Sequence, residues 1–189
     1  YTFDLLFSYG IFKKEINNFK IAKNLFTLSI KKYPLKINSY ILLAEIFRIE
    51  NNVDDALKAL LAAKQIEKSN SEIDYNLSIT YKTIRSFKEA ILSINSAIKQ
   101  QPQNQIYKIL KADILIECFE DEKAKELLLN LQLKKDSLLN FQREILISKV
   151  FINQKKYPLA EKVLLELRKL FSNQKILYLN LSDLYFKNK

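Results

Sequence analysis

Residues 37–70 read INSYILLAEIFRIENNVDDALKALLAAKQIEKSN, and residues 71–104 read SEIDYNLSITYKTIRSFKEAILSINSAIKQQPQN. Both stretches place a small residue at their twentieth position, Ala56 and Ala90, so one pattern recurs after 34 residues. Self-similarity at a period of about 20 to 50 residues is typical of stacked supersecondary units. The sequence therefore predicts a repeat array.

Three columns of small residues extend this period along the chain. The first column lies at intervals of 34, 34, 34 and 36 residues and consists of Ala22, Ala56, Ala90, Ala124 and Ala160. Seven residues later, two helical turns along the same face, stand Ser29, Ala63, Ala97, Leu131 and Leu167. Twelve residues before the first column stand Gly10, Ala44, Ser78, Ala112 and Ser148. Small side chains at fixed intervals indicate that two helices approach closely there, where overpacking costs about 1 to 3 kcal/mol.

Eleven helices follow from the apolar pattern between these columns. We predict them over residues 3–15, 19–32, 37–50, 53–66, 71–84, 87–100, 105–118, 121–134, 139–153, 157–171 and 175–187. Turns are expected where polar residues interrupt the pattern, at Asn17–Asn18, Asn51–Asn52, Arg85–Ser86 and Asn153–Gln154. Ser69 with Glu72 and Ser86 with Glu89 have the spacing of capping boxes at helix starts.

Composition favours an all-α fold and argues against catalysis. The chain has a single glycine, Gly10, and three prolines, whereas sheets and hairpins depend on Gly and Pro turns. With no His there is no imidazole base, and with one Gly there is no phosphate-binding loop. Cys118 stands alone, which excludes an intrachain disulfide and a cysteine-based zinc site. We expect no enzyme, no catalytic residue, no cofactor and no metal.

The repeat resembles the tetratricopeptide repeat. The second copy matches at Tyr40, Leu43, Ala44, Phe47, Ala56 and Ala63. The third copy matches at Leu77, Ser78, Tyr81, Phe87, Ala90, Ala97 and Pro102. The resemblance implies a right-handed superhelical solenoid of helix-turn-helix repeats over residues 3–36, 37–70, 71–104, 105–138 and 141–174, with a final half repeat at 175–189. The sequence departs from the family pattern at Lys13, Lys111, Asp121 and Leu131. The alternative architecture is a helical bundle without repeats, such as a globin-like fold.

Proteins that look like this act as adaptors, with the first helix of each repeat lining a concave groove that holds a partner. Carried over to this sequence, the resemblance places in the groove Phe7, Ile11, Ile41, Glu45, Arg48, Tyr75, Ile79, Lys82, Ile109, Ile116, Ile145 and Ile152. The family members that hold a C-terminal carboxylate use Lys at positions occupied here by Phe7, Ile41 and Tyr75. We therefore expect a mainly apolar groove that binds an amphipathic helix or an extended hydrophobic segment of another protein.

Other interpretations of the same surfaces stay open. The groove could be filled by the chain's own upstream segment, because the sequence begins at Tyr1 without Met and reads as a fragment of a longer protein. The net charge of +10 suggests nucleic acid or an anionic surface, although only four of the 31 basic residues are Arg, the residue that phosphate recognition favours. Apolar residues on nearly all faces of the last helix suggest homo-oligomerisation through residues 175–189. No apolar run approaches the roughly twenty residues of a membrane span, and both cytoplasm and periplasm remain open as locations.

Overall fold

The computed structural model describes residues 1–188 and contains helices but no strand within that range. The helices are α1 (Phe3–Glu15), α2 (Phe19–Lys32), α3 (Ile37–Ile49), α4 (Val53–Ile66), α5 (Ser71–Thr83), α6 (Phe87–Gln100), α7 (Gln105–Glu117), α8 (Asp121–Leu129), α9 (Leu138–Asn153), α10 (Tyr157–Leu170) and α11 (Lys175–Lys187). They belong to two units, an N-terminal body over Tyr1–Pro102 and a C-terminal body over Gln103–Lys189. The all-α fold of helix-turn-helix repeats is confirmed.

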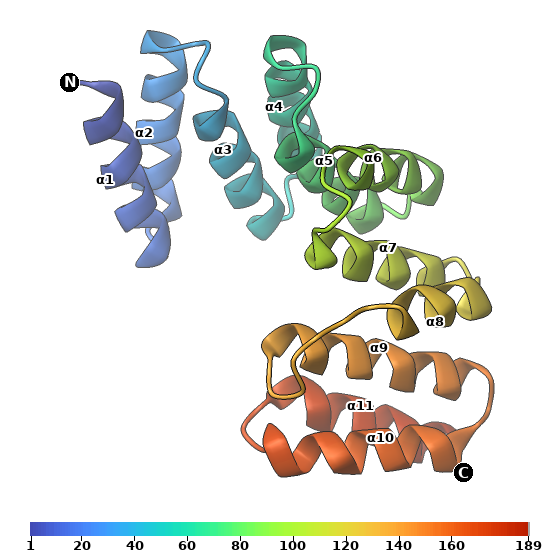
Figure 1. Ribbon diagram of the computed structural model, residues 1–189. Coiled ribbons are helices and arrows are strands. Elements are labelled where there is room, and N and C mark those ends of the chain that lie inside the picture. The colour runs from blue at the N-terminus through green and yellow to red at the C-terminus, as the bar shows by residue number, and fades with distance from the viewer. Residues whose placement is uncertain (189) are drawn as a thin grey trace. The chain divides into compact units, whose positions relative to one another are not determined.

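The N-terminal body consists of three helix hairpins, coloured blue to green in Figure 1. Within each hairpin the two helices pack on each other, and α2 and α4 also pack on the first helix of the next hairpin. The core between α3, α4 and α5 is built around Leu60, Ile73 and the small residues Ala56 and Ala63. Because α2 and α4 each pack on helices of two hairpins, apolar contacts extend from one hairpin to the next.

The small residues of the repeat lie on buried helix surfaces. Ala22, Ala56, Ala90, Ala124 and Ala160 are all completely buried. Ser78 is buried with them, and its hydroxyl donates to the carbonyl of Ala90 at 2.9 Å. The Ser29 hydroxyl lies 2.9 Å from that of Ser39 in the next hairpin. The repeat period therefore reflects close helix packing both within and between hairpins.

The turn inside each hairpin has the same backbone geometry in five repeats. Its central residue adopts a left-handed conformation, with φ between 58° and 61°, at Asn17, Asn51, Arg85, Phe119 and Lys155. The next amide donates back to a carbonyl five residues earlier, for example Asn52 N to Phe47 O at 2.8 Å. This is a common way to end a helix. In the fifth repeat the helix continues through Asn153, so the turn lies later than the expected Asn153–Gln154, around Lys155.

Both expected capping boxes are wrong in detail. At α5 the cap is Asn70, whose side-chain oxygen accepts from the amides of Glu72 and Ile73, so Ser69 lies outside the helix. At α6 Ser86 is the capping residue, but its side chain makes no capping hydrogen bond. At α5 the capping residue is Asn70 and not Ser69, and Asn accepts amide hydrogen bonds at this position as well as Ser does.

In the C-terminal body α8 ends at Leu129, five residues before the expected end of the helix. Beyond it Leu131 is buried, and its carbonyl accepts from Arg143 of α9 at 3.3 Å. The carbonyl of Gln132 accepts from Gln105 of α7 at 3.1 Å. Side chains of neighbouring helices thus bind carbonyls of the segment that follows α8. The rest of this body packs α9, α10 and α11 around Leu164 and Leu177.

Candidate functional site: the first-helix patch

The twelve expected groove residues lie on α1, α3 and α5 of the N-terminal body and on α7 and α9 of the C-terminal body. Five of them are buried, each at most 7% exposed: Ile41, Ile109, Ile116, Ile145 and Ile152. Ile41 packs in the core with Ala44 and Leu60, and Ile152 packs with Leu164. These five isoleucines therefore stabilise the hairpins and offer little surface to a partner.

The other seven residues are half-buried, and all of them belong to the N-terminal body. We call them the first-helix patch: Phe7, Ile11, Glu45, Arg48, Tyr75, Ile79 and Lys82. Only four of the seven are apolar. The surface that the structure leaves accessible at the expected groove positions is consequently more polar than the sequence suggested.

An ion pair joins α1 to α3 at the edge of the patch. Lys14 Nζ lies 2.6 Å from a carboxylate oxygen of Glu45, and both side chains are partly shielded from solvent. At this exposure such a pair contributes at most about 1 kcal/mol to stability. Its main effect here is to fix the position of the Glu45 carboxylate and to neutralise that negative charge of the patch.

Arg48 joins α3 to α5. Its Nη1 donates to the side-chain oxygen of Asn76 at 3.0 Å, to the Asn76 carbonyl at 3.3 Å and to the Thr80 hydroxyl at 3.4 Å. Burial lowers the pKa of Arg48 from its ordinary value, and the nearby Glu45 and Tyr75 oppose that shift. The guanidinium stays charged at neutral pH because its reference pKa is so high. The patch thus contains a fixed positive charge.

Three patch residues share one face of α5. Tyr75, Ile79 and Lys82 are spaced at i, i+4 and i+7, which brings them into line along a helix. They place an aromatic ring and an aliphatic side chain in a row beside Arg48 of α3, with Lys82 at the end of the row. Tyr75 and Ile79 can contact an apolar side chain of a bound segment, and Arg48 can contact a carboxylate of the same segment.

At the α1 end the patch merges with the core. The Phe7 ring stacks on Phe3 with centroids 5.2 Å apart and lies 6.1 Å from the ring of Phe26. Ile11 packs against the cluster that contains Phe26 and Leu43. The accessible chemistry of the patch therefore concentrates at α3 and α5.

The sequence did not point to Asn76 and Thr80, which hold Arg48. Both are buried on α5 and were not expected to touch the groove. Arg48 is 28 residues from Asn76, so their pairing depends on how adjacent hairpins stack. No motif within one repeat could have identified it.

The last helix has the exposed apolar residues that suggested homo-oligomerisation. α11 buries Leu177, Leu181 and Leu184 against the C-terminal body. Its other faces expose Ile176, Tyr178, Leu179, Tyr185 and Phe186.

No group of three or more Cys, Asp or Glu side chains within residues 1–188 is arranged to hold a metal ion. Across the same residues, no helix has both the length and the hydropathy that crossing a bilayer requires.

Comparisons with known proteins add to this geometry. No family model matches the sequence, and no curated protein matches it. Among solved structures, the chain is similar to a tetratricopeptide repeat protein from Parabacteroides merdae, with a TM-score of 0.79 and 17% identity over 98% of this chain and 73% of the other. A thermophilic protein of the same kind from Thermus thermophilus gives a TM-score of 0.78 and 13% identity over 98% and 100%. YrrB, a tetratricopeptide repeat protein with an unusual peptide-binding site, gives 0.63 and 9% over 92% and 88%.

Proposed function

Because the chain has the tetratricopeptide-repeat fold, we propose that it is a protein-protein interaction scaffold that holds a segment of another protein on the first-helix patch. The observation that carries the proposal is the row formed by Tyr75, Ile79 and Lys82 beside the anchored Arg48. YrrB, with its peptide-binding site, supports the idea that such a fold can hold a peptide. We propose no catalytic activity for the chain.

The composition of the patch defines the partner segment. Tyr75 and Ile79 offer apolar contact, and Arg48 adds a positive charge that Asn76 and Thr80 hold in place. An extended or helical segment with an apolar residue next to an acidic one fits this surface. This partner is more acidic than the hydrophobic segment that the sequence suggested, because five of the expected apolar residues are buried.

A peptide array tests the proposal. Twelve-residue peptides with systematically varied apolar and acidic content are incubated with the labelled protein, and hits are measured by fluorescence anisotropy. We expect peptides that combine both features to bind, and Ile79→Asp to weaken them at least tenfold. Leu92→Asp, at an exposed apolar position of α6, is the matched control and should leave the affinity within twofold. Equal binding by Ile79→Asp and wild type would contradict the proposal.

Charge removal gives a second readout of the same site. Arg48→Gln should weaken the preference of the array for acidic peptides, since it removes the positive charge beside the apolar row. A short single-stranded oligonucleotide serves as the competing polyanion. Steeply salt-dependent binding of the oligonucleotide by wild type, without peptide binding, would instead favour the nucleic-acid function.

A second candidate function, self-association through residues 175–189, rests on the exposed face of α11. Leu179→Ser with Phe186→Ser removes two exposed apolar side chains and spares the buried Leu177, Leu181 and Leu184. If the face joins two copies, light scattering should show a dimer for wild type and a monomer for the double variant. A wild-type monomer at high concentration would rule this function out.

A further inference from the structure

A carboxylate of the first-helix patch pairs with the neighbouring hairpin, although an arginine lies next to it on its own helix. Glu45 precedes Arg48 by three residues on α3, a spacing that brings two side chains together on a helix surface. The Glu45 carboxylate nevertheless contacts Lys14 of α1, with Nζ and Oε2 2.6 Å apart. Lys14 and Arg48 stand 34 residues apart, at the same position of successive repeats. Glu45 thus pairs with one of two cations at equivalent positions.

Arg48 is left with hydrogen bonds to neutral groups. Its bonds to Asn76 and Thr80 of α5 all use Nη1, and within residues 1–188 it forms no ion pair. A guanidinium has five N–H donors, so Nε and Nη2 retain donors that these bonds do not use. Burial lowers the pKa of Arg48, and the charge of Glu45 opposes this shift. The guanidinium is therefore partly desolvated and near enough to Glu45 to be affected by its charge.

Lys14, Glu45 and Arg48 together carry one excess positive charge in a partly shielded place. The side chains of Lys14 and Glu45 are 20% and 36% exposed, and Arg48 is half-buried. A carboxylate binds a guanidinium through short, charge-assisted hydrogen bonds, and these are stronger where water is partly excluded. One incoming carboxylate would neutralise the site. Glu45 would do the same if it turned from Lys14 to Arg48.

We propose that Lys14 is a positioning residue of the first-helix patch, which holds the Glu45 carboxylate away from Arg48 and so keeps Arg48 available to the carboxylate of a bound segment. This inference rests on the proposed function, which supplies that segment. Asn76 and Thr80 fix the arginine from the α5 side, and Lys14 removes the internal competitor from the α1 side. Loss of the Lys14 charge turns Glu45 into an inhibitor of the site.

A second ion pair between the first two hairpins is the matched control. Lys23 of α2 lies 2.6 Å from Glu50, and the two side chains are 31% and 32% exposed. Glu50 follows Arg48 by two residues, a spacing at which two side chains do not face each other on a helix. Lys23→Met therefore removes the same charge and a similar ion pair as Lys14→Met, without releasing a carboxylate towards Arg48.

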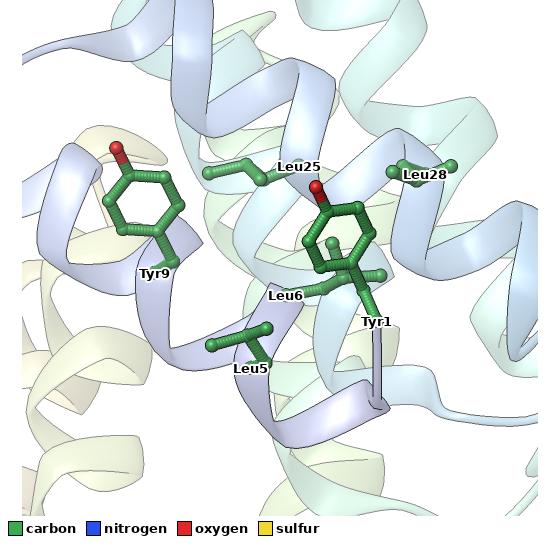
Figure 2. A pocket seen from close by; sticks show the side chains of 6 residues that line it. All are labelled: Tyr1, Leu5, Leu6, Tyr9, Leu25 and Leu28. Atoms are coloured by element: carbon green, nitrogen blue, oxygen red, sulfur yellow. The ribbon is translucent and has the colours of Figure 1, made fainter.

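Leu5 of α1 supplies a second control. It lies with residues of α1 and α2 around a pocket of about 470 Å³, which is lined by Tyr1, Leu5, Leu6, Tyr9, Leu25 and Leu28 (Figure 2). Leu5 is nine residues, or about two and a half helical turns, before Lys14, so the two side chains lie on opposite faces of α1. Leu5→Asp changes the charge of α1 by the same amount as Lys14→Met, but on the other face.

Arginine NMR tests the role of Lys14 without a peptide. The chain has four arginines, so labelling them with 15N gives four Nε–Hε signals, and Arg48→Lys assigns the signal of Arg48. We expect sodium acetate to shift the Arg48 signal of wild type saturably, beyond the effect of sodium chloride at equal ionic strength. In Lys14→Met the signal should lie at a new position before acetate is added and should respond less to acetate. Glu45→Gln in the same chain should restore the response.

Peptide binding tests the consequence for the site. The probe is an apolar and acidic peptide selected by the array, together with a version whose acidic residue is replaced by its amide. Lys14→Met should weaken the acidic peptide at least fivefold by fluorescence anisotropy, and adding Glu45→Gln should return the affinity to within twofold of wild type. Lys23→Met and Leu5→Asp should each stay within twofold. The amide peptide should bind Lys14→Met and wild type equally, and circular dichroism verifies that every variant keeps its helicity.

The proposal is overturned if Lys14→Met leaves the Arg48 signal and its acetate response unchanged, or if Glu45→Gln fails to restore them. It is also overturned if Lys23→Met or Leu5→Asp weakens the acidic peptide as much as Lys14→Met does, because net charge would then be the cause. Failure of the proposed function gives a different result. No peptide would bind, while the Arg48 signal would still show that Lys14 keeps Glu45 away from Arg48.

Discussion

Gly10 and Phe26 are in such close contact that a Cβ atom on Gly10 would lie 2.6 Å from Cε1 of the Phe26 ring. Ala is favoured over Gly in a helix interior by about 1 kcal/mol, but Phe26 is completely buried and has little room to move. We predict that Gly10→Ala lowers the free energy of unfolding by about 1 to 2 kcal/mol, measured by urea denaturation. In a Phe26→Leu background the same change should become neutral or stabilising. Equal effects in both backgrounds would show that contact with Phe26 is not the cause of the loss of stability.

The left-handed turn residues respond differently to glycine. Phe119 has φ of 61° and is largely exposed, and a left-handed conformation costs an ordinary residue about 1 to 2 kcal/mol. Phe119→Gly should therefore raise the free energy of unfolding by roughly 1 kcal/mol, after the entropy cost of glycine. Asn51→Gly is the matched control, because Asn tolerates this conformation and should gain less. Thermal unfolding of both variants measures the two gains in stability. A larger gain for Asn51→Gly than for Phe119→Gly would contradict the prediction.

Asp74 joins three helices of the N-terminal body. Its carboxylate, 4% exposed, accepts from Lys64 of α4 at 2.5 Å and from Ser96 and Gln100 of α6 at 2.6 and 2.8 Å. Asp74→Ala removes the shared acceptor and should cost about 2 to 4 kcal/mol of stability, measured by denaturant unfolding.

The control for Asp74 is another aspartate that is paired with a lysine. Asp55 binds Lys58 at 2.9 Å on the surface of α4, where solvent screens the pair. Asp55→Ala should therefore cost much less than Asp74→Ala. Similar losses for the two variants would show that the burial of Asp74 does not determine its contribution.

Cys118 should be a slow nucleophile. Partial burial raises the pKa of its thiol above the ordinary value, and the negative charges of Glu120 and Glu117 raise it further. At any given pH the folded protein therefore holds less thiolate than a free cysteine does, and the thiolate is the reactive form. The rate of iodoacetamide alkylation should reach its midpoint at a higher pH in the folded protein than in urea. Glu120→Gln should lower that midpoint, and an unchanged midpoint in this variant would remove Glu120 as a cause.

Most of the fold could be predicted from the sequence because close helix packing restricts residue size at fixed intervals. The small residues gave the register, and with the register the ends of most helices followed to within one residue. The early end of α8 at Leu129 could not be predicted, since it depends on side chains of α7 and α9 that bind carbonyls of a segment remote in sequence.

The candidate site was harder to predict than the fold. Position within a repeat indicates on which side of a helix a residue lies, but it does not give the depth of burial. Ile41 and Tyr75 occupy the same groove position in successive repeats, yet Ile41 is 4% exposed and Tyr75 is half-buried. The depth of burial therefore depends on the neighbours that tertiary packing brings to each position.

The turns inside the hairpins have one backbone geometry built from Asn17, Asn51, Arg85, Phe119 and Lys155. Four different side chains, among them a bulky aromatic and two long cations, occupy a conformation that is usually associated with glycine or asparagine. Packing of the two flanking helices must therefore maintain the left-handed conformation of the turn residue, whichever side chain that residue has. Such a position can change freely over evolutionary time without altering the path of the chain. This freedom helps to explain how proteins that share only 9% to 17% of their residues with this chain keep the same architecture.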